Sequence, residues 1–202
     1  MSQIPQLMSG RALEHGISLM VDHGGTSSAK MHVGGQAACQ VAASTALTNT
    51  TDETALSSLT IPANTLVAGS TIRVRAAGIA TATNSTNTLT VQLKLDTSAT
   101  VIGSAESIVS TGATDVADND IFDIDAYIVV RTAGSSGTAV AVGSFVPMDA
   151  PGTARQSVLK ASFTIDTTSA NVLQITGDWS VANAGNSCRS DIFVVDIVNP
   201  ST

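Results

Sequence analysis

The chain has 202 residues, enough for one domain or for one domain with an extended arm. Thr and Ser supply 50 of these residues, whereas Lys, Glu and aromatic residues are scarce, which favours β-strands over helices. The formal net charge of −7, without a Lys/Arg cluster, argues against nucleic-acid binding, and the 43% apolar content is enough for a hydrophobic core.

The first 35 residues differ from the rest of the chain, because their apolar side chains follow no steady period and are interrupted by Gly24-Gly25 and Gly34-Gly35. Two interpretations stay open. This segment completes the core of its own domain as a strand or short helix, or it is an arm that buries its apolar side chains on another subunit. Fully extended, 35 residues reach about 115 Å, which is enough to cross to a neighbour. The arm interpretation assigns the contact to Ile4, Leu7, Met8, Leu13, Ile17, Leu19, Met20 and Val21.

Neither a membrane span nor a signal peptide is predicted. The longest unbroken apolar run is only the five residues Ala126 to Val130, and Met1 to Pro5 carries no basic residue. The protein is therefore expected to be made in a reducing cytoplasm. In that compartment Cys39 and Cys188 are expected to be small buried apolar residues rather than a disulfide.

After residue 35, segments with strand periodicity follow one another, starting with one predicted near Gln40 to Leu47. Leu89 to Asp96 gives the cleanest alternation, with Leu and Val at every second position. Clusters of Gly, Asn, Ser and Pro separate the segments. About eight or nine strands are expected, in an antiparallel β-sandwich. Each of the other predicted strands has a set of apolar residues that are expected to share one face of that strand. The sets are Ile72 and Val74; Phe122, Ile124, Ala126, Ile128 and Val130; Val140, Val142 and Val146; Leu159, Ala161, Phe163 and Ile165; Leu173, Ile175 and Trp179; Phe193, Val195 and Ile197.

A Pro/Asn/Gly corner joins two of these strands, the first running from about Thr48 to Ile61 and the second starting near Thr71. Pro62 presets φ for a corner, Asn64 can cap a turn through its side chain, and Gly69 tolerates a positive φ. In the second strand, Arg73 projects from the face opposite Ile72 and Val74. The only tryptophan, Trp179, is interpreted as a core residue rather than a ligand platform.

The segment from Thr48 to Val74 resembles a pattern in the virion proteins of tailed bacteriophages: a Thr/Asn/Glu strand entry, an Ile-Pro-Ala-Asn-x-Leu corner and an Ile-Arg-Val strand. Three later pieces match in order, Thr88 to Leu95, Tyr127 to Thr132 and Asp166 to Ser180. The resemblance implies a jelly roll, frequently assembled as a homotrimer on the outside of a particle. It covers residues from about 40 to 198.

Two clusters contain residue types that can bind metal ions. The acidic run Asp115, Asp118, Asp120, Asp123 and Asp125 could offer oxygens to calcium, but it lacks the Gly and Glu of an EF-hand. It is interpreted as a solvated acidic loop, with Asp123 and Asp125 on the polar face of a strand. His15, His23 and His32 match no zinc spacing. No metal and no cofactor are expected.

Catalytic signatures were not found either. The chain has no Gly-x-Ser-x-Gly elbow, no phosphate-binding Gly loop with a Lys, and no Glu in an apolar strand setting. We therefore expect a non-enzymatic protein, with a surface glycan hydrolase as the enzymatic alternative.

The function expected from the sequence and the resemblance is that of a capsid decoration (cement) protein. Residues 1–35 form the anchoring arm and residues 36–202 the jelly-roll domain. The partner is the major capsid protein of the same phage, the location is the outer capsid surface, and assembly takes place in the host cytoplasm. A tail, baseplate or fibre component with a receptor-binding jelly roll is the alternative, which the scarcity of aromatic residues and the lack of fibre repeats disfavour.

Overall fold

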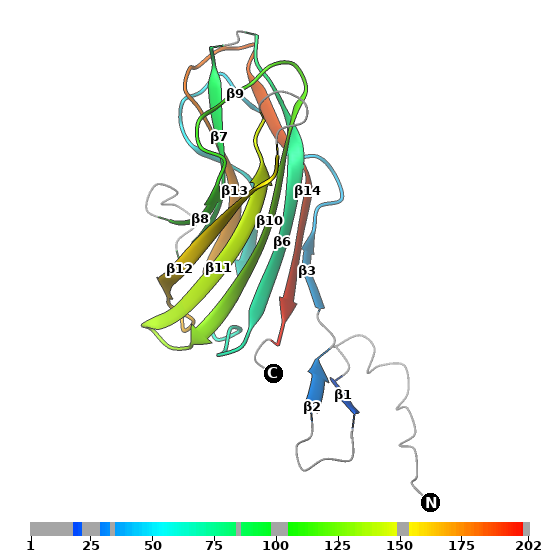
Figure 1. Ribbon diagram of the computed structural model, residues 1–202, viewed down its shortest axis with the longest axis vertical. Helices are drawn as coiled ribbons and strands as arrows, with labels where there is room; N and C mark the ends of the chain where they lie inside the picture. Colours follow the sequence, from blue (N-terminus) through cyan, green and yellow to red (C-terminus); the bar gives the residue numbers. More distant parts are fainter. Residues whose placement is uncertain are drawn as a thin grey trace, which may run out of the picture.

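The computed structural model describes residues 18–21, 29–32, 35–83, 86–97, 105–148 and 154–199, with side chains from residue 37 onward. All regular structure in these residues is β-strand, and the all-β antiparallel sandwich expected from the sequence is confirmed (Figure 1). The strands are β1 (Ser18–Val21), β2 (Ala29–His32), β3 (Gly35–Cys39), β4 (Leu47–Thr48), β5 (Thr54–Ile61), β6 (Thr71–Thr81), β7 (Thr88–Asp96), β8 (Glu106–Ser110), β9 (Thr114–Asp115), β10 (Asp120–Thr132), β11 (Gly137–Val146), β12 (Gln156–Ile165), β13 (Asn171–Trp179) and β14 (Ser187–Val198).

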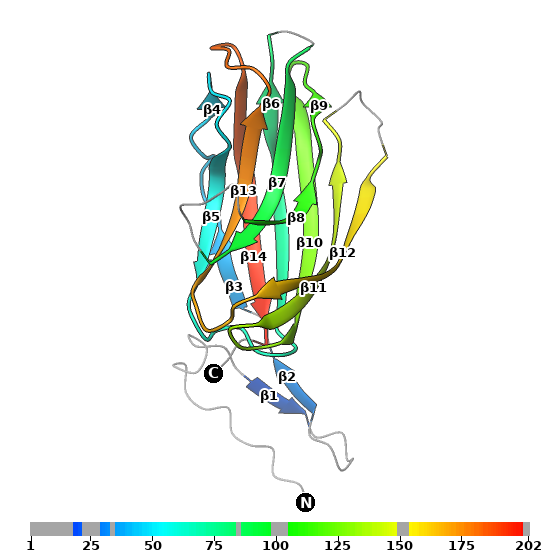
Figure 2. The ribbon, with the colours of Figure 1, turned by 90° about the vertical axis from the view of Figure 1, so that its left-hand side faces the viewer.

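Twelve of these strands form two sheets that pack face to face (Figure 2). The seven-stranded sheet has the order β12-β11-β10-β6-β14-β3, and β4 also pairs with β14. The five-stranded sheet has the order β5-β13-β7-β8, and β9 also pairs with β7. Every strand pair is antiparallel. The count exceeds the expected eight or nine partly because β4 and β9 have only two residues each, too few to give a period.

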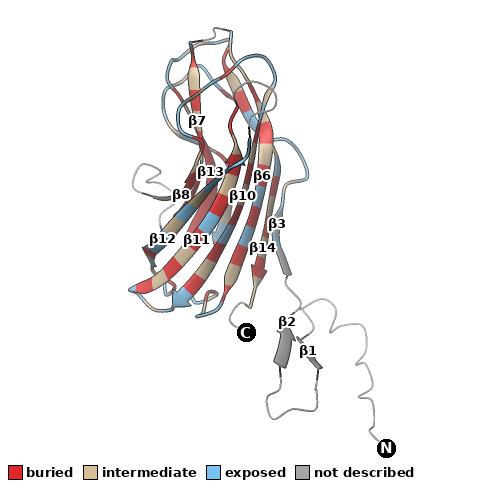
Figure 3. Ribbon diagram, viewed as in Figure 1, coloured by how far each residue is buried: buried red, intermediate tan, exposed pale blue. Residues whose placement is uncertain are grey.

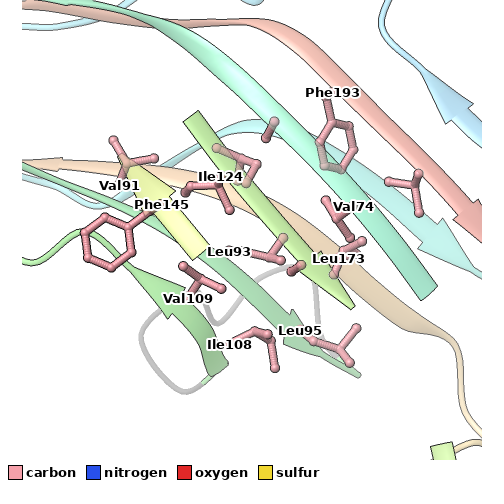
Figure 4. Close-up of a cluster of buried hydrophobic side chains, with 14 of the residues drawn as sticks. Val74, Val91, Leu93, Leu95, Ile108, Val109, Ile124, Phe145, Leu173 and Phe193 are labelled. Carbon is pink, nitrogen blue, oxygen red and sulfur yellow. The ribbon is translucent and has the colours of Figure 1, made fainter. Parts of the chain in front are cut away.

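The core lies between the two sheets. Every second residue of a regular strand points toward the opposite sheet and is buried there. Along β10, buried and more exposed residues alternate, and the same banding is visible on β6 (Figure 3). Side chains from both sheets meet in one cluster (Figure 4). Val74, Ile124 and Phe193 come from the seven-stranded sheet, and Leu93 and Leu173 face them from the five-stranded sheet. All four Phe residues and Trp179 are buried.

The Pro/Asn/Gly corner carries the chain from one sheet to the other, because β5 belongs to the five-stranded sheet and β6 to the seven-stranded sheet. Asn64 has φ 63°, and its backbone N–H donates to the carbonyl oxygen of Thr167 at 2.8 Å. Gly69 has φ 89° and donates to the carbonyl oxygen of Val130 at 2.9 Å. The expected side-chain cap at Asn64 is wrong: within the described residues this residue contributes a left-handed backbone instead.

The strand expected near Gln40 to Leu47 is also wrong. Regular pairing with β14 stops at Cys39 and resumes at Leu47. At the same level, the register of β14 with its other neighbour, β6, shifts between Ser190 and Ile192. Side chains occupy the gap: the Gln40 amide donates to the carbonyl oxygen of Ser190 at 2.7 Å, and Ser57 of β5 donates to Gln40 at 3.0 Å. The segment thus joins the edges of both sheets instead of continuing a strand.

A second register shift corrects the face assignment in β12. Leu159 was expected to share the face of Phe163 and Ile165, but it is 73% exposed while both of them are buried. The pairing of β12 with β11 slips between Lys160 and Phe163, which inserts one residue and turns Leu159 to the outside. A sequence pattern of period two cannot reveal such an insertion.

β1 and β2 pair with each other and with no other strand in the described part of the chain. Both views show this hairpin beyond the end of the sandwich at which β14 finishes (Figures 1 and 2). An isolated two-stranded hairpin is at best marginally stable in water.

Candidate docking face

The outer face of the seven-stranded sheet carries a row of side chains that runs across four strands. Tyr127 of β10 lies opposite Arg73 of β6 and Val142 of β11, and Val142 lies opposite Leu159 of β12. Tyr127, Val142 and Leu159 are 49%, 48% and 73% exposed. The Arg73 guanidinium stands 5.6 Å from the centroid of the Tyr127 ring, a cation–π distance. We call these four residues the outer row.

A network of two arginines and two aspartates lies beside the outer row. Arg75 of β6 contacts Asp123 at 2.9 Å and Asp125 at 3.0 Å, and Arg155 contacts the same two carboxylates at 3.0 Å each. Arg155 also donates to the hydroxyl oxygen of Ser144 at 2.7 Å. The network ties β6 and β10 to the segment that enters β12.

A hollow of about 240 Å³ lies where the outer row and the network meet. Its lining combines guanidinium, carboxylate and aromatic groups: Arg73, Val74, Arg75, Asp125, Ala126, Tyr127, Val194 and Asp196. Arg73 lies directly opposite Asp196 in the β6–β14 register, yet no ion pair joins them within the described residues. The arrangement offers a shallow, mixed-charge surface with exposed apolar side chains, which is suited to contact with another protein.

Of the five residues of the corner, the Arg-bearing strand and the core that the sequence singled out as structural motifs, Arg73 alone belongs to this face. Pro62, Asn64 and Gly69 form the corner, and Trp179 is buried in the core at 1% exposure. The indole Nε1 of Trp179 has no hydrogen-bond partner among the described residues. The structure therefore does not bring these five residues together in one site.

The arm residues are only partly covered by the structure. Leu19, Met20 and Val21 belong to β1, whose side chains are not described. The remaining arm residues and two of the histidines lie outside the described residues: Ile4, Leu7, Met8, Leu13, Ile17, His15 and His23. His32 is the last residue of β2.

The sequence interpretation missed a second polar cluster, on the outer face of the five-stranded sheet. The Lys94 ammonium lies 2.7 Å from the Glu53 carboxylate, to which Thr176 also donates at 2.7 Å. Lys94 is only 6% exposed. Burial, and then the charge of Glu53, raise the pKa of the nearby Asp178 carboxyl, although Lys94 acts in the opposite direction. Lys94 stands at a polar position of an alternating strand, but nothing in the sequence pairs it with Glu53.

The acidic run is divided between two environments. Asp123 and Asp125 lie on the polar face of β10, as expected, and there they form the ion pairs of the arginine network, which the sequence did not predict. Asp120 accepts a hydrogen bond from the backbone N–H of Ala117 at 2.6 Å and so shapes the turn before β10. The signal that sequence reasoning lacked was the register that places Asp125 opposite Arg75.

The two cysteines lie in different environments, and both are free thiols. Cys188 is buried, and burial raises the pKa of its thiol to about 12, with a further contribution from the charge of Asp191. Cys39 is exposed, so its expected burial is wrong. It sits on the short edge strand β3 opposite Val194, where nothing in the seven-stranded sheet covers it from the edge.

No group of three or more His, Cys, Asp or Glu side chains is placed to hold a metal ion among the residues that the structure describes. A helix long and apolar enough to cross a membrane is likewise missing from these residues. Comparison of the chain with models of protein families, with curated proteins and with solved structures finds no match in any of the three.

Proposed function

We propose that the protein is a non-enzymatic virion structural protein of a tailed phage, namely a capsid decoration protein on the outer surface of the head. The observation that carries the proposal is the β1–β2 hairpin, which pairs with no strand of the sandwich. Because such a hairpin gains little stability by itself, its apolar residues Leu19, Met20 and Val21 need a surface supplied by another chain. In the proposal that surface belongs to the major capsid protein.

The strand order supports the jelly-roll part of the proposal. If β3, β5, β6, β7, β8, β10, β13 and β14 are counted in chain order, one sheet reads first-eighth-third-sixth and the other second-seventh-fourth-fifth. Nested Greek keys of an eight-stranded jelly roll produce this order. β11 and β12 then extend one sheet by a hairpin, and the corner at Pro62 is the first crossing between the sheets after β5.

Decoration would stabilise the head by mass action. A protein that binds the assembled lattice and not the loose capsid subunit shifts the equilibrium toward the lattice. A stable contact of this kind buries more than about 1,000 Å² in total. The sandwich is expected to fold and assemble into a homotrimer in the host cytoplasm before it binds the head. The arm is expected to contact adjacent capsid subunits and hold them together.

The distribution of aromatic residues favours decoration over the alternative of a receptor-binding tail component. Receptor and glycan sites commonly rely on exposed aromatic rings. Among the described residues, all Phe residues and Trp179 are buried, and only Tyr127 offers an exposed ring. Binding of the purified protein to host cells would reverse this preference.

The test is co-sedimentation of the full chain, and of a chain lacking residues 1–33, with expanded capsids that carry no decoration protein. The full chain is expected to saturate the capsids at a fixed stoichiometry, and the truncated chain to stay in the supernatant with its sandwich folded. Val181→Asp, a change at an exposed turn far from the hairpin in sequence, is the control that should still bind. Unchanged affinity of the truncated chain would overturn the proposed role of the arm.

A further inference from the structure

We propose that the outer row and the surface around it form the contact between copies of this chain, and that this face packs on an acidic surface of a second copy. The inference rests on the proposed function, which includes a homotrimer, and it names the face that the trimer uses. Three observations carry it: exposed apolar side chains in register, arginines without carboxylate partners, and the charge of the remaining surface.

The apolar content of the face is concentrated rather than scattered. Tyr127, Val142 and Leu159 are consecutive partners across β10, β11 and β12, so their side chains are neighbours at the spacing of about 4.8 Å between strands. Single exposed apolar residues are ordinary on protein surfaces, whereas a contiguous group marks an interaction site. Leu159 is the most exposed of the three, at 73%, so covering it would remove the largest fraction of its surface from water.

The charges of the face are partly unmatched. Arg75, Arg155 and Arg189 have carboxylate partners on the same face. Arg73 and Arg131 have none among the described residues, although both lie on strands of this sheet with their residues exposed. A partner that places one carboxylate beside Arg73 and another beside Arg131, four residues further along β10 than Tyr127, would therefore complete two ion pairs.

A second copy supplies those carboxylates. Asp123, Asp125, Asp191 and Asp196 lie on the outer face of the seven-stranded sheet. The other described residues from position 37 onward carry nine carboxylates and only the two ammonium groups of Lys94 and Lys160. The arginine-bearing face of one copy and the acidic remainder of the next are electrostatically complementary. A contact between two different patches of the same chain forms a closed ring when the rotation from one copy to the next is a whole fraction of a full turn. A rotation of one third of a turn gives a trimer.

The face is large enough for a specific contact. β6, β10, β11 and β12 have ten to thirteen residues each. At about 3.3 Å per residue and about 4.8 Å between strands, these four strands cover roughly 600 Å². Burying this area and a matching area on the second copy gives roughly 1,200 Å², at the lower end of specific interfaces.

Sedimentation velocity of the full chain tests the inference. The wild-type protein is expected to sediment as a trimer. Val142→Glu and Leu159→Glu place a carboxylate among apolar contacts and are expected to weaken association by about tenfold or more. Val181→Glu is the matched control, since Val181 is exposed to a similar extent (45% against 48% for Val142) and lies in the turn after β13. Arg73→Glu should weaken association too, and more strongly at low salt than at high salt.

The fold of each variant is monitored by the fluorescence of the buried Trp179, which separates lost association from lost structure. A monomeric wild-type protein, or trimers that persist in both outer-row variants, would overturn the inference. A wild-type monomer whose capsid binding is lost in the same variants would assign the face to the capsid protein and also overturn it. Trimers that depend on the outer row but ignore capsids would leave the inference intact and refute the decoration function.

Discussion

The ion pair between Lys94 and Glu53 is the most buried in the described part of the chain, with side chains 7% and 17% exposed. It contrasts with the pair between Lys160 and Glu106, whose side chains are 36% and 39% exposed. The same two residue types thus occur once in a shielded setting and once in a solvated one. Removing the carboxylate should lower the free energy of unfolding strongly only for the pair of Lys94 and Glu53, because the buried Lys94 ammonium would then have neither its ion-pair partner nor water around it.

Glu53→Gln is therefore expected to lower the free energy of unfolding by about 3 kcal/mol. Glu106→Gln, the matched control at the solvated pair, is expected to cost less than about 1 kcal/mol. Both values come from urea denaturation followed by Trp179 fluorescence at neutral pH. Equal losses in the two variants would mean that the Lys94 pair is as solvated as the other.

The two thiols give a second contrast between buried and exposed groups. A thiolate is the reactive form of cysteine, and burial raises the pKa of Cys188 to about 12. Below that pH this thiol stays protonated as well as inaccessible. At about pH 8 a thiol reagent is expected to modify one of the two cysteines in the native protein, Cys39, and both after denaturation. Cys39→Ser should abolish the native reaction, and rapid native labelling of two thiols would contradict the buried setting of Cys188.

Among the strands, β6 has no room for a side chain at Gly78, which lies between β14 and β10. A Cβ atom placed on Gly78 would lie 2.0 Å from the carbonyl oxygen of Arg189 and 2.7 Å from the ring of Phe122. Phe122 is the register partner of Gly78 on β10, and its ring fills the space that a side chain would need. The irregular register of β14 begins beside this contact, between Ser190 and Ile192.

Gly78→Ala is accordingly expected to cost about 3 kcal/mol or more of unfolding free energy, because backbone on one side and a buried ring on the other must both shift. Gly112→Ala is the control: its φ of 67° is unfavourable for Ala, but no atom lies within 4 Å of the added Cβ. Its cost should stay near 1 to 2 kcal/mol, roughly the penalty of a left-handed residue. Thermal unfolding of both variants measures the difference, and a larger loss for Gly112→Ala would refute the steric account.

How well the sequence predicts each strand depends on how regularly apolar and polar residues alternate along it. β7, β10, β13 and most of β14 carry an unbroken period of two, so their core faces can be assigned from the sequence. Leu159 could not be placed, because it depends on a register irregularity that a pattern does not encode. Gln40 could not be placed either, because it lies where the pairing with β14 is interrupted. The outer row and the Lys94–Glu53 pair join residues from different strands, so they exist only once the register is known.

For the whole molecule, the single core that both sheets share predicts all-or-none unfolding of the sandwich. Trp179 belongs to β13 of one sheet and packs in the same cluster as Phe193 of the other. Denaturation curves from Trp179 fluorescence and from far-ultraviolet circular dichroism should therefore coincide. Two separate transitions would mean that the sheets lose structure independently.

The β1–β2 hairpin lies outside this core, so a chain lacking residues 1–33 should unfold at nearly the same denaturant concentration as the full chain.

The direction of β14 has a practical consequence. Its twelve residues run from the turn after Trp179 to the end where the β1–β2 hairpin lies (Figures 1 and 2), a length of about 40 Å. A peptide cargo inserted beside the exposed Val181 would therefore project from the end opposite the hairpin, whereas cargo inserted directly after β14 would start at the hairpin's end. If the proposed decoration function holds, the β13–β14 turn would be the attachment point for an antigen or an enzyme that must face the solution.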